Sequence, residues 1–230
     1  MRPGGQPGYY PGFHTLEQAA FWDEATRKVV RERVRRHEGI RFFAPEEAVL
    51  MRAVCDRILP QDDRDQEHKI PVLEAIDARL FAGRIEGYRF ADMPADGDAH
   101  RLGLIAITEI ADFLFGKRFE SATGLEQDRV LLTLHDARPP AGEAIWRQMP
   151  VDRYWLLLVN DVIGAYYAHP YAWDEIGFGG PAYPRGYMRL NDGDPEPWEV
   201  QERRYEFAAP SDSLSGIFTP IGRGNRGGER

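Results

Sequence analysis

The sequence predicts an all-α protein, built as an irregular orthogonal bundle of helices with a long irregular arm at its C-terminal end. Several stretches of the 230-residue chain repeat apolar residues at three- and four-residue spacing, and no stretch alternates as a strand does. Beyond residue 176 this periodicity fades, while Gly, Pro and aromatic residues accumulate. We expect an irregular N-terminal extension at 1–14, a helical domain at 15–176 and an extended arm at 177–230.

The first helix is expected to begin at Thr15, where Gln18 three residues later completes a capping-box pattern. Helical spacing places five residues on one apolar stripe: Leu16, Ala19, Trp22, Ala25 and Val29. The second half of this helix, residues 27–36, is strongly basic. Such a charge run indicates a solvated face, or else a surface that docks onto an acidic partner.

Prolines and glycines mark the ends of the next two helices. The second helix begins at Pro45, which suits a first-turn position, and ends before Pro60. It contains Cys55, which we interpret as a packed thiol because no His lies nearby in sequence. The third helix runs from Pro71 to a plausible stop at Gly83.

A polar linker at about residues 84–98 separates these helices from three more. On the fourth helix the apolar residues Leu102, Ile105, Ile110 and Phe113 keep the helical period, which only Glu109 breaks. Thr123 and Glu126 then form a second capping-box pattern that opens the fifth helix. The last helix, at about 152–168, is apolar nearly all the way round, so we expect it to be central and buried.

Composition limits the function classes. A net charge of −8 argues against nucleic acid as a general partner. The single cysteine excludes an intrachain disulfide and any multi-cysteine metal site. No stretch approaches the roughly 18 apolar residues that span a membrane. The N-terminal residues show neither the apolar core of a signal peptide nor a twin-arginine signal, so we expect a cytoplasmic protein, or a periplasmic one if it is processed or co-exported.

The stretch from His169 to Tyr187 is dense in aromatics, glycines and prolines, and we expect it to be irregular rather than helical. Exposed aromatics on irregular backbone need something to pack against, either the protein's own core or a partner. We predict a partner interface made of these residues: His169, Tyr171, Trp173, Glu175, Phe178, Tyr183, Arg185, Tyr187 and Trp198.

No catalytic constellation emerges from the residues alone. The glycines of 177–180 lack the Lys-Ser/Thr ending of a phosphate loop, and no Gly-x-Ser-x-Gly elbow exists. The acidic turn at 62–68 lacks the glycine pivot of a calcium loop. We therefore assign no catalytic, cofactor-binding or metal-ligating residue, and favour a binding protein. Two alternatives stay open: a metal-dependent enzyme that uses His169, Asp174 and Glu175, and a homo-oligomeric helical scaffold.

Three motifs together resemble the gluconate 2-dehydrogenase subunit 3 family. They are Arg57-Ile-Leu-Pro-Gln-Asp-Asp63 at the end of the second helix, Gly164-Ala-Tyr-Tyr-Ala-His-Pro170, and Glu175-Ile-Gly-Phe-Gly-Gly-Pro181. The resemblance covers most of residues 42–187.

The resemblance implies a noncatalytic, chaperone-like small subunit that stabilises a heteromeric FAD-dependent sugar or glycoside oxidoreductase. In such complexes the FAD and the oxidation of a CH–OH group belong to a large flavoprotein of the glucose-methanol-choline (GMC) type, and a cytochrome or another acceptor takes the electrons. The small subunit has no cofactor of its own. Exported relatives carry a twin-arginine signal, from which this sequence departs.

Overall fold

The computed structural model describes residues 14–35, 39–85, 87–176, 178, 180 and 181. These residues form helices and no strand, which confirms the predicted all-α class. The elements, in chain order, are η1 (Thr15–Phe21), α1 (Glu24–Val34), α2 (Pro45–Ile58), α3 (Val72–Phe81), α4 (Asp96–Phe115), η2 (Phe119–Ser121), α5 (Gly124–His135), α6 (Glu143–Trp146), α7 (Val151–Tyr167) and α8 (Pro170–Ile176). Apart from His14, the predicted extension at 1–14 lies outside the described residues, and so does most of the arm.

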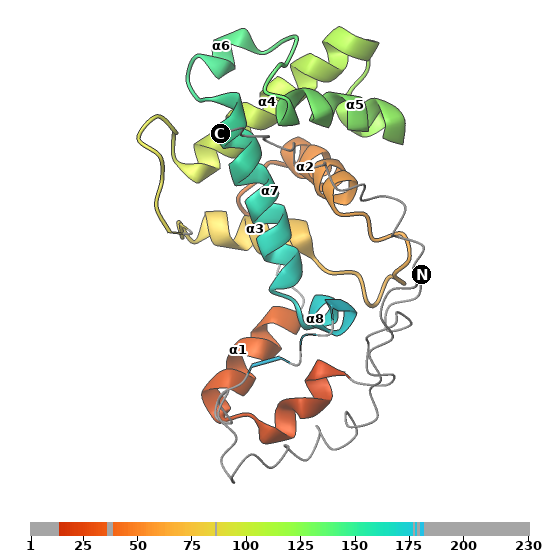
Figure 1. Ribbon diagram of the computed structural model, residues 1–230, viewed down its shortest axis with the longest axis vertical. Coiled ribbons are helices and arrows are strands. Elements are labelled where there is room, and N and C mark those ends of the chain that lie inside the picture. The colour runs from red at the N-terminus through yellow and green to blue at the C-terminus, as the bar shows by residue number, and fades with distance from the viewer. Residues whose placement is uncertain (1–13, 36–38, 86, 177, 179, 182–230) are drawn as a thin grey trace, which may run out of the picture.

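Helix α7 is the axis of the molecule. It packs against α2, α3, α4, α5 and α8, and the ribbon shows α4, α5 and α6 at one of its ends and α8 at the other (Figure 1). The prediction that this helix is central is confirmed. Complete burial is wrong, because Leu156, Ile163 and Tyr167 form a stripe that is 46%, 40% and 39% exposed.

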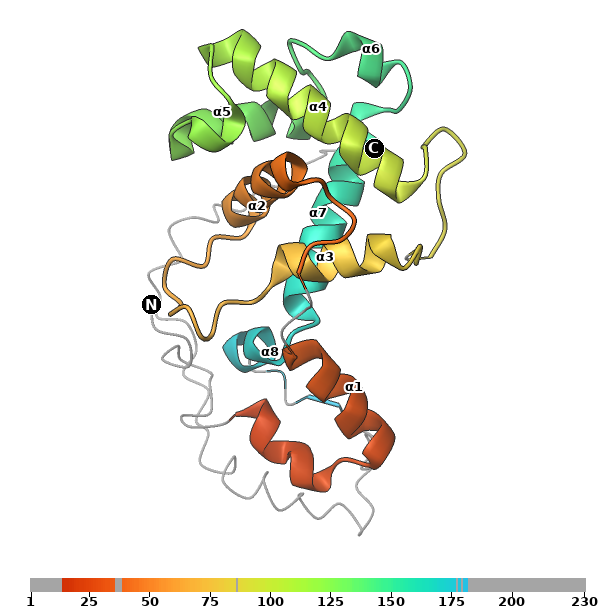
Figure 2. The ribbon, with the colours of Figure 1, turned by 180° about the vertical axis from the view of Figure 1, so that it is seen from behind.

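The 3₁₀-helix η1 and helix α1 make a separate N-terminal lobe, which lies below the bundle next to α8 (Figure 2). The sequence predicts one continuous helix here, and that prediction is wrong. The chain breaks at Trp22, and the Asp23 carboxylate then caps α1 by accepting a hydrogen bond from the Thr26 amide at 2.8 Å. The break lets Trp22 turn inward, with 3% of its surface exposed, while Val29 on the expected stripe stays half exposed.

The later helices form where their capping residues predict. Thr123 and Glu126 make the reciprocal capping box, with the Glu126 carboxylate accepting the Thr123 amide at 2.7 Å. Helix α4 exists, and two of its four periodic apolar residues, Leu102 and Ile110, pack in the core. Ile105 and Phe113 are 52% and 65% exposed, and the buried face carries smaller residues and a histidine: Ala99, His100, Gly103, Leu104, Ala106, Ile107, Ile110 and Ala111.

A buried ionic group joins α3, α4 and α7 inside the bundle. The Asp161 carboxylate accepts a hydrogen bond from Arg79 Nη2 at 2.5 Å and contacts His100 Nε2 at 2.7 Å. Arg79 also donates through Nη1 to Asp96 at 2.8 Å. Since removing one member of a buried charge pair leaves the other uncompensated, this group ties the three helices to one arrangement.

A second buried carboxylate organises the loop before α2. Asp77 is fully buried on α3, and its oxygens accept the backbone amides of Arg41, Phe42 and Phe43 at 2.8–3.0 Å. Three amide donors satisfy the charge that burial would otherwise make costly. The loop that leads into α2 is therefore fixed to α3 by one side chain.

Candidate interaction site

Arg64, the residue directly after the first motif, meets residues of the second and third motifs at the junction between α7, α8 and the turn after α2. The Arg64 side chain, only 5% exposed, reaches Glu175 Oε2 through Nη2 at 2.9 Å. Arg64 Nη2 also donates to the Tyr166 hydroxyl at 3.2 Å and to the Tyr171 carbonyl at 3.4 Å. The Tyr166 hydroxyl in turn donates to Glu175 Oε2 at 2.6 Å. We call Arg64, Tyr166 and Glu175 the motif clamp, because it joins segments about a hundred residues apart in sequence.

The surroundings of the clamp shift the protonation of its tyrosine. Burial, followed by the hydrogen bond to the Glu175 carboxylate, raises the pKa of Tyr166 to about 12. The hydroxyl is thus a stable donor and not a general base at neutral pH. Its chemistry fits a structural link between helices.

The turn after α2 is braced from within. The Gln61 amide group forms two hydrogen bonds with the backbone of Ile70, donating to its carbonyl at 3.0 Å and accepting its amide at 2.8 Å. The Asp65 carboxylate accepts from the His68 and Glu67 amides and lies 2.7 Å from the His68 ring. Asp65 thus stabilises the local structure of this turn.

Residues 170–176 are helical, so the prediction that the aromatic stretch is irregular from His169 onward is wrong for α8. Pro170 occupies the first position of α8, where its missing amide costs no hydrogen bond. His169 precedes the helix, is buried, and its Nδ1 accepts the Tyr171 amide at 3.2 Å. The ring of Tyr171 contacts the rings of His68 and His169, with centroids 5.2 and 4.7 Å away.

Trp173 is 5% exposed and forms the core of the N-terminal lobe with Trp22 and Val30. Its indole N–H donates to the Tyr167 carbonyl at 2.7 Å, and the Arg33 guanidinium lies 5.4 Å from its ring centre. Within this chain Trp173 therefore links the lobe to α8.

The candidate metal ligands do not converge. Asp174 accepts the Thr15 amide at 2.8 Å and lies 3.4 Å from His14 Nδ1. Glu175 instead pairs with Arg64 in the motif clamp, and His169 accepts the Tyr171 amide. Within the described parts of the chain, no three His, Cys, Asp or Glu side chains lie close enough to hold a metal ion. The geometry therefore offers the metal-dependent alternative no support.

The remaining predicted interface residues differ in accessibility. Phe178 is 42% exposed, and neighbouring Ile176 is 54% exposed. Tyr171 and Glu175 are partly exposed. Tyr183, Arg185, Tyr187 and Trp198 lie outside the described residues, so their part of the interface stays a prediction.

Sequence reasoning missed Arg64, Tyr166 and Trp22 as residues that organise this site. Arg64 directly follows the first motif and Tyr166 lies inside the second, so their positions were a signal. Neither residue type identifies a partner a hundred residues away. Cys55 was interpreted correctly, since it is buried, and desolvation raises the pKa of its thiol.

Among the described residues, no helix is long and apolar enough to cross a membrane. No curated protein and no solved structure shows significant similarity to the chain. The family model for gluconate 2-dehydrogenase subunit 3 matches residues 45–180, which span α2 to the end of α8 and include all the residues of the motif clamp. Because this match covers more than half of the sequence, the chain belongs to the gluconate 2-dehydrogenase subunit 3 family.

Proposed function

We propose that the protein is the noncatalytic small subunit of an FAD-dependent sugar or glycoside oxidoreductase, and that it docks onto a GMC-type flavoprotein. The large subunit would hold the FAD, oxidise the CH–OH group and pass electrons to a cytochrome or another acceptor. The small subunit would stabilise its partner. Membership of a dehydrogenase subunit family supports this proposal.

The observation that carries the proposal is how the polar side chains in and directly beside the three motifs are used. Arg64, Tyr166 and Glu175 satisfy one another, and Asp174 caps η1. Reactive groups in an enzyme are arranged around a site that a substrate can enter. The motifs here instead fix the orientation of α8, so a structural role for them is favoured.

Fixing α8 places exposed apolar side chains at the start of the arm. Ile176 and Phe178 lie just beyond the motif clamp, and about half of each side chain is exposed. Rigid apolar anchors of this kind contribute most of the binding energy at protein interfaces, at about 2 kcal/mol or more each. We propose that this end of α8, together with the accessible parts of Tyr171 and Glu175, contacts the flavoprotein.

The test is co-expression with a GMC-type flavoprotein and measurement of the affinity of the complex. The double variant Ile176→Ser and Phe178→Ser should weaken binding by about 30-fold or more, as loss of roughly 2 kcal/mol predicts. The matched control is Phe113→Ser on α4, a more exposed aromatic remote from α8, which should bind like the wild type. An unchanged affinity for the double variant would contradict this placement of the interface.

A further inference from the structure

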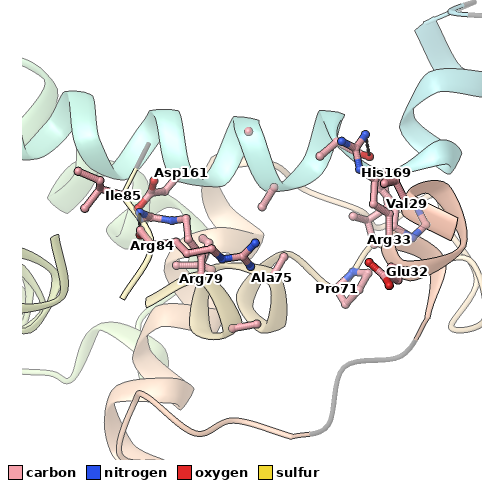
Figure 3. Close-up of a pocket in the computed structure, with 16 residues that line it drawn as sticks. Val29, Glu32, Arg33, Pro71, Ala75, Arg79, Arg84, Ile85, Asp161 and His169 are labelled. Atoms are coloured by element: carbon pink, nitrogen blue, oxygen red, sulfur yellow. Dashed lines mark hydrogen bonds and ion pairs between the residues drawn. The ribbon is translucent and has the colours of Figure 1, made fainter. Parts of the chain in front are cut away.

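A groove of about 740 Å³ runs between the N-terminal lobe and the bundle, and the motif clamp does not use it. Its floor is formed by small residues of α3 and α7: Ala75, Ala78, Gly164, Ala165 and Ala168. Helix α1 and the residues after α3 form its two ends (Figure 3). The groove therefore lies where helix α1, which is outside the family match, meets α3 and α7, which are inside it.

Each end of the groove combines an apolar side chain with a cation. Val29 and Arg33 lie at the end near His169, and Ile85 and Arg84 lie at the end near Asp161 (Figure 3). Val29 is 49% exposed and Ile85 is 64% exposed, so both present apolar surface that water now covers. Such paired ends fit a ligand that is partly apolar and carries acidic groups.

The charges that line the groove are unequal. The charges of Arg79 and Asp161 cancel through their 2.5 Å hydrogen bond. The other charged lining residues are two cations, Arg33 and Arg84, and one anion, Glu32. The exposed Arg84 guanidinium makes no hydrogen bond or ion pair with any described residue. Helix α1 contributes Val29, Glu32 and Arg33, so the lining carries three arginines (Arg33, Arg79 and Arg84) and two acidic residues (Glu32 and Asp161) in a chain whose net charge is −8. A positive groove on an acidic protein favours an acidic partner.

The length of the groove distinguishes a peptide from a small acid. Asp161 and Ala168 lie at opposite ends of the floor on α7, and seven residues of helix rise roughly 10 Å. One small carboxylate cannot reach cations at both ends. An extended peptide rises about 3.3 Å per residue and points alternate side chains to one face, so carboxylates four residues apart would lie about 13 Å apart on that face.

We propose that the groove receives an extended, acidic and partly apolar segment of the large subunit. One carboxylate would pair with Arg84 and another with Arg33, while apolar side chains of the segment cover Ile85 and Val29. The small residues of the floor let the backbone of the segment approach closely. This inference rests on the proposed function, and it adds a second contact region on the side of the molecule formed by α1, α3 and α7.

The test uses the full-length chain co-expressed with the flavoprotein. Arg84→Glu should weaken the complex at least tenfold, and Ile85→Ser should weaken it severalfold. Arg129→Glu and Leu125→Ser on α5 are matched controls, since both residues are exposed and distant from the groove. Arg33 stays unchanged because it also donates to the Ala168 carbonyl.

A reciprocal substitution identifies the occupant. Lysine in place of the paired acidic residue of the flavoprotein should restore the affinity lost in Arg84→Glu, and the Glu32–Arg33 and Arg84–Ile85 backbone amides should gain hydrogen-exchange protection in the complex. If the wild-type complex forms and the groove variants bind as tightly as their controls, the groove inference fails and the proposed function stands. If no complex forms, both the proposed function and the groove inference are contradicted. Binding of a small dicarboxylate in the groove without protection by the flavoprotein would also overturn it.

Discussion

The bundle and the N-terminal lobe differ in the size of the buried apolar core that stabilises each of them. The bundle of α2–α7 surrounds one continuous apolar core and contains the Arg79–Asp161–His100 group. The buried apolar core of the lobe consists of Trp22, Val30 and Trp173. The lobe contacts the rest of the chain mainly through α8 (Figure 2). The comparison indicates a bundle that sets the fold and a lobe that opens more easily.

Local opening in proteins follows the amount of buried apolar contact in each part. The lobe also lies outside the region that the family model matches, whereas α8 lies inside it. Helix α8 therefore connects the two regions, and we call it the joint. The motif clamp attaches it to the bundle, and Trp173 and Asp174 attach the lobe to it.

The largest expected effect is in the bundle. Asp161→Ala should lower the free energy of unfolding by about 3–5 kcal/mol, because the Arg79 guanidinium loses a buried counter-charge and His100 loses its hydrogen-bond partner. Chemical denaturation with circular dichroism measures this loss. Asp128→Ala, which breaks the more exposed ion pair with Arg57, is the control and should cost about 1 kcal/mol or less. Equal losses in the two variants would show that the buried group does not stabilise the bundle.

A comparable truncation in the lobe should act locally. Trp173→Ala removes one of the two tryptophans of the small cluster, a change that costs about 3–5 kcal/mol in a closed core. Because the lobe can detach, we expect hydrogen-exchange protection to vanish in η1 and α1 while α4 and α7 keep theirs. If the bundle of this variant unfolds at the same denaturant concentration as the lobe, the lobe does not open independently of the bundle.

A smaller effect is expected at the joint. Arg64→Met should cost about 1.5–3 kcal/mol, since Glu175 and the Tyr166 hydroxyl lose a charged hydrogen-bond partner. Proteolysis should then cut near α8 before it cuts the bundle. Arg52→Met, which removes a more exposed pair with Glu74, provides the comparison and should leave the cleavage pattern unchanged.

The smallest effect is a dependence of stability on alkaline pH. The pKa of Tyr166 is about 12 in the folded protein, above the value of 10 for a free tyrosine, so the fold favours the protonated hydroxyl. Its contribution is complete below pH 10 and is lost as the pH rises through about 12. Denaturation midpoints should therefore fall less steeply between pH 10 and 12 in Tyr166→Phe than in the wild type. If the denaturation midpoints of the two proteins fall equally steeply with pH, the Tyr166 hydroxyl does not stabilise the motif clamp.

Sequence periodicity and capping predicted α2, α3, α5 and α7, because their boundaries depend on local residues such as Pro45 and Thr123. The exposed face of α4 was not predicted, since Ile105 and Phe113 are as apolar as the residues that the bundle buries. The motif clamp depends on contacts between distant segments, which no local pattern encodes. The lobe break at Trp22 likewise depends on Trp173, far along the chain.

We propose that this subunit works by binding a flavoprotein. Size-exclusion chromatography of the chain co-expressed with a GMC-type flavoprotein, with visible absorbance recorded across the elution, tests it most directly. We predict a single complex that contains both chains and absorbs as a flavin, and a flavoprotein that is less stable when expressed alone. Separate elution of two stable, folded proteins would contradict the account.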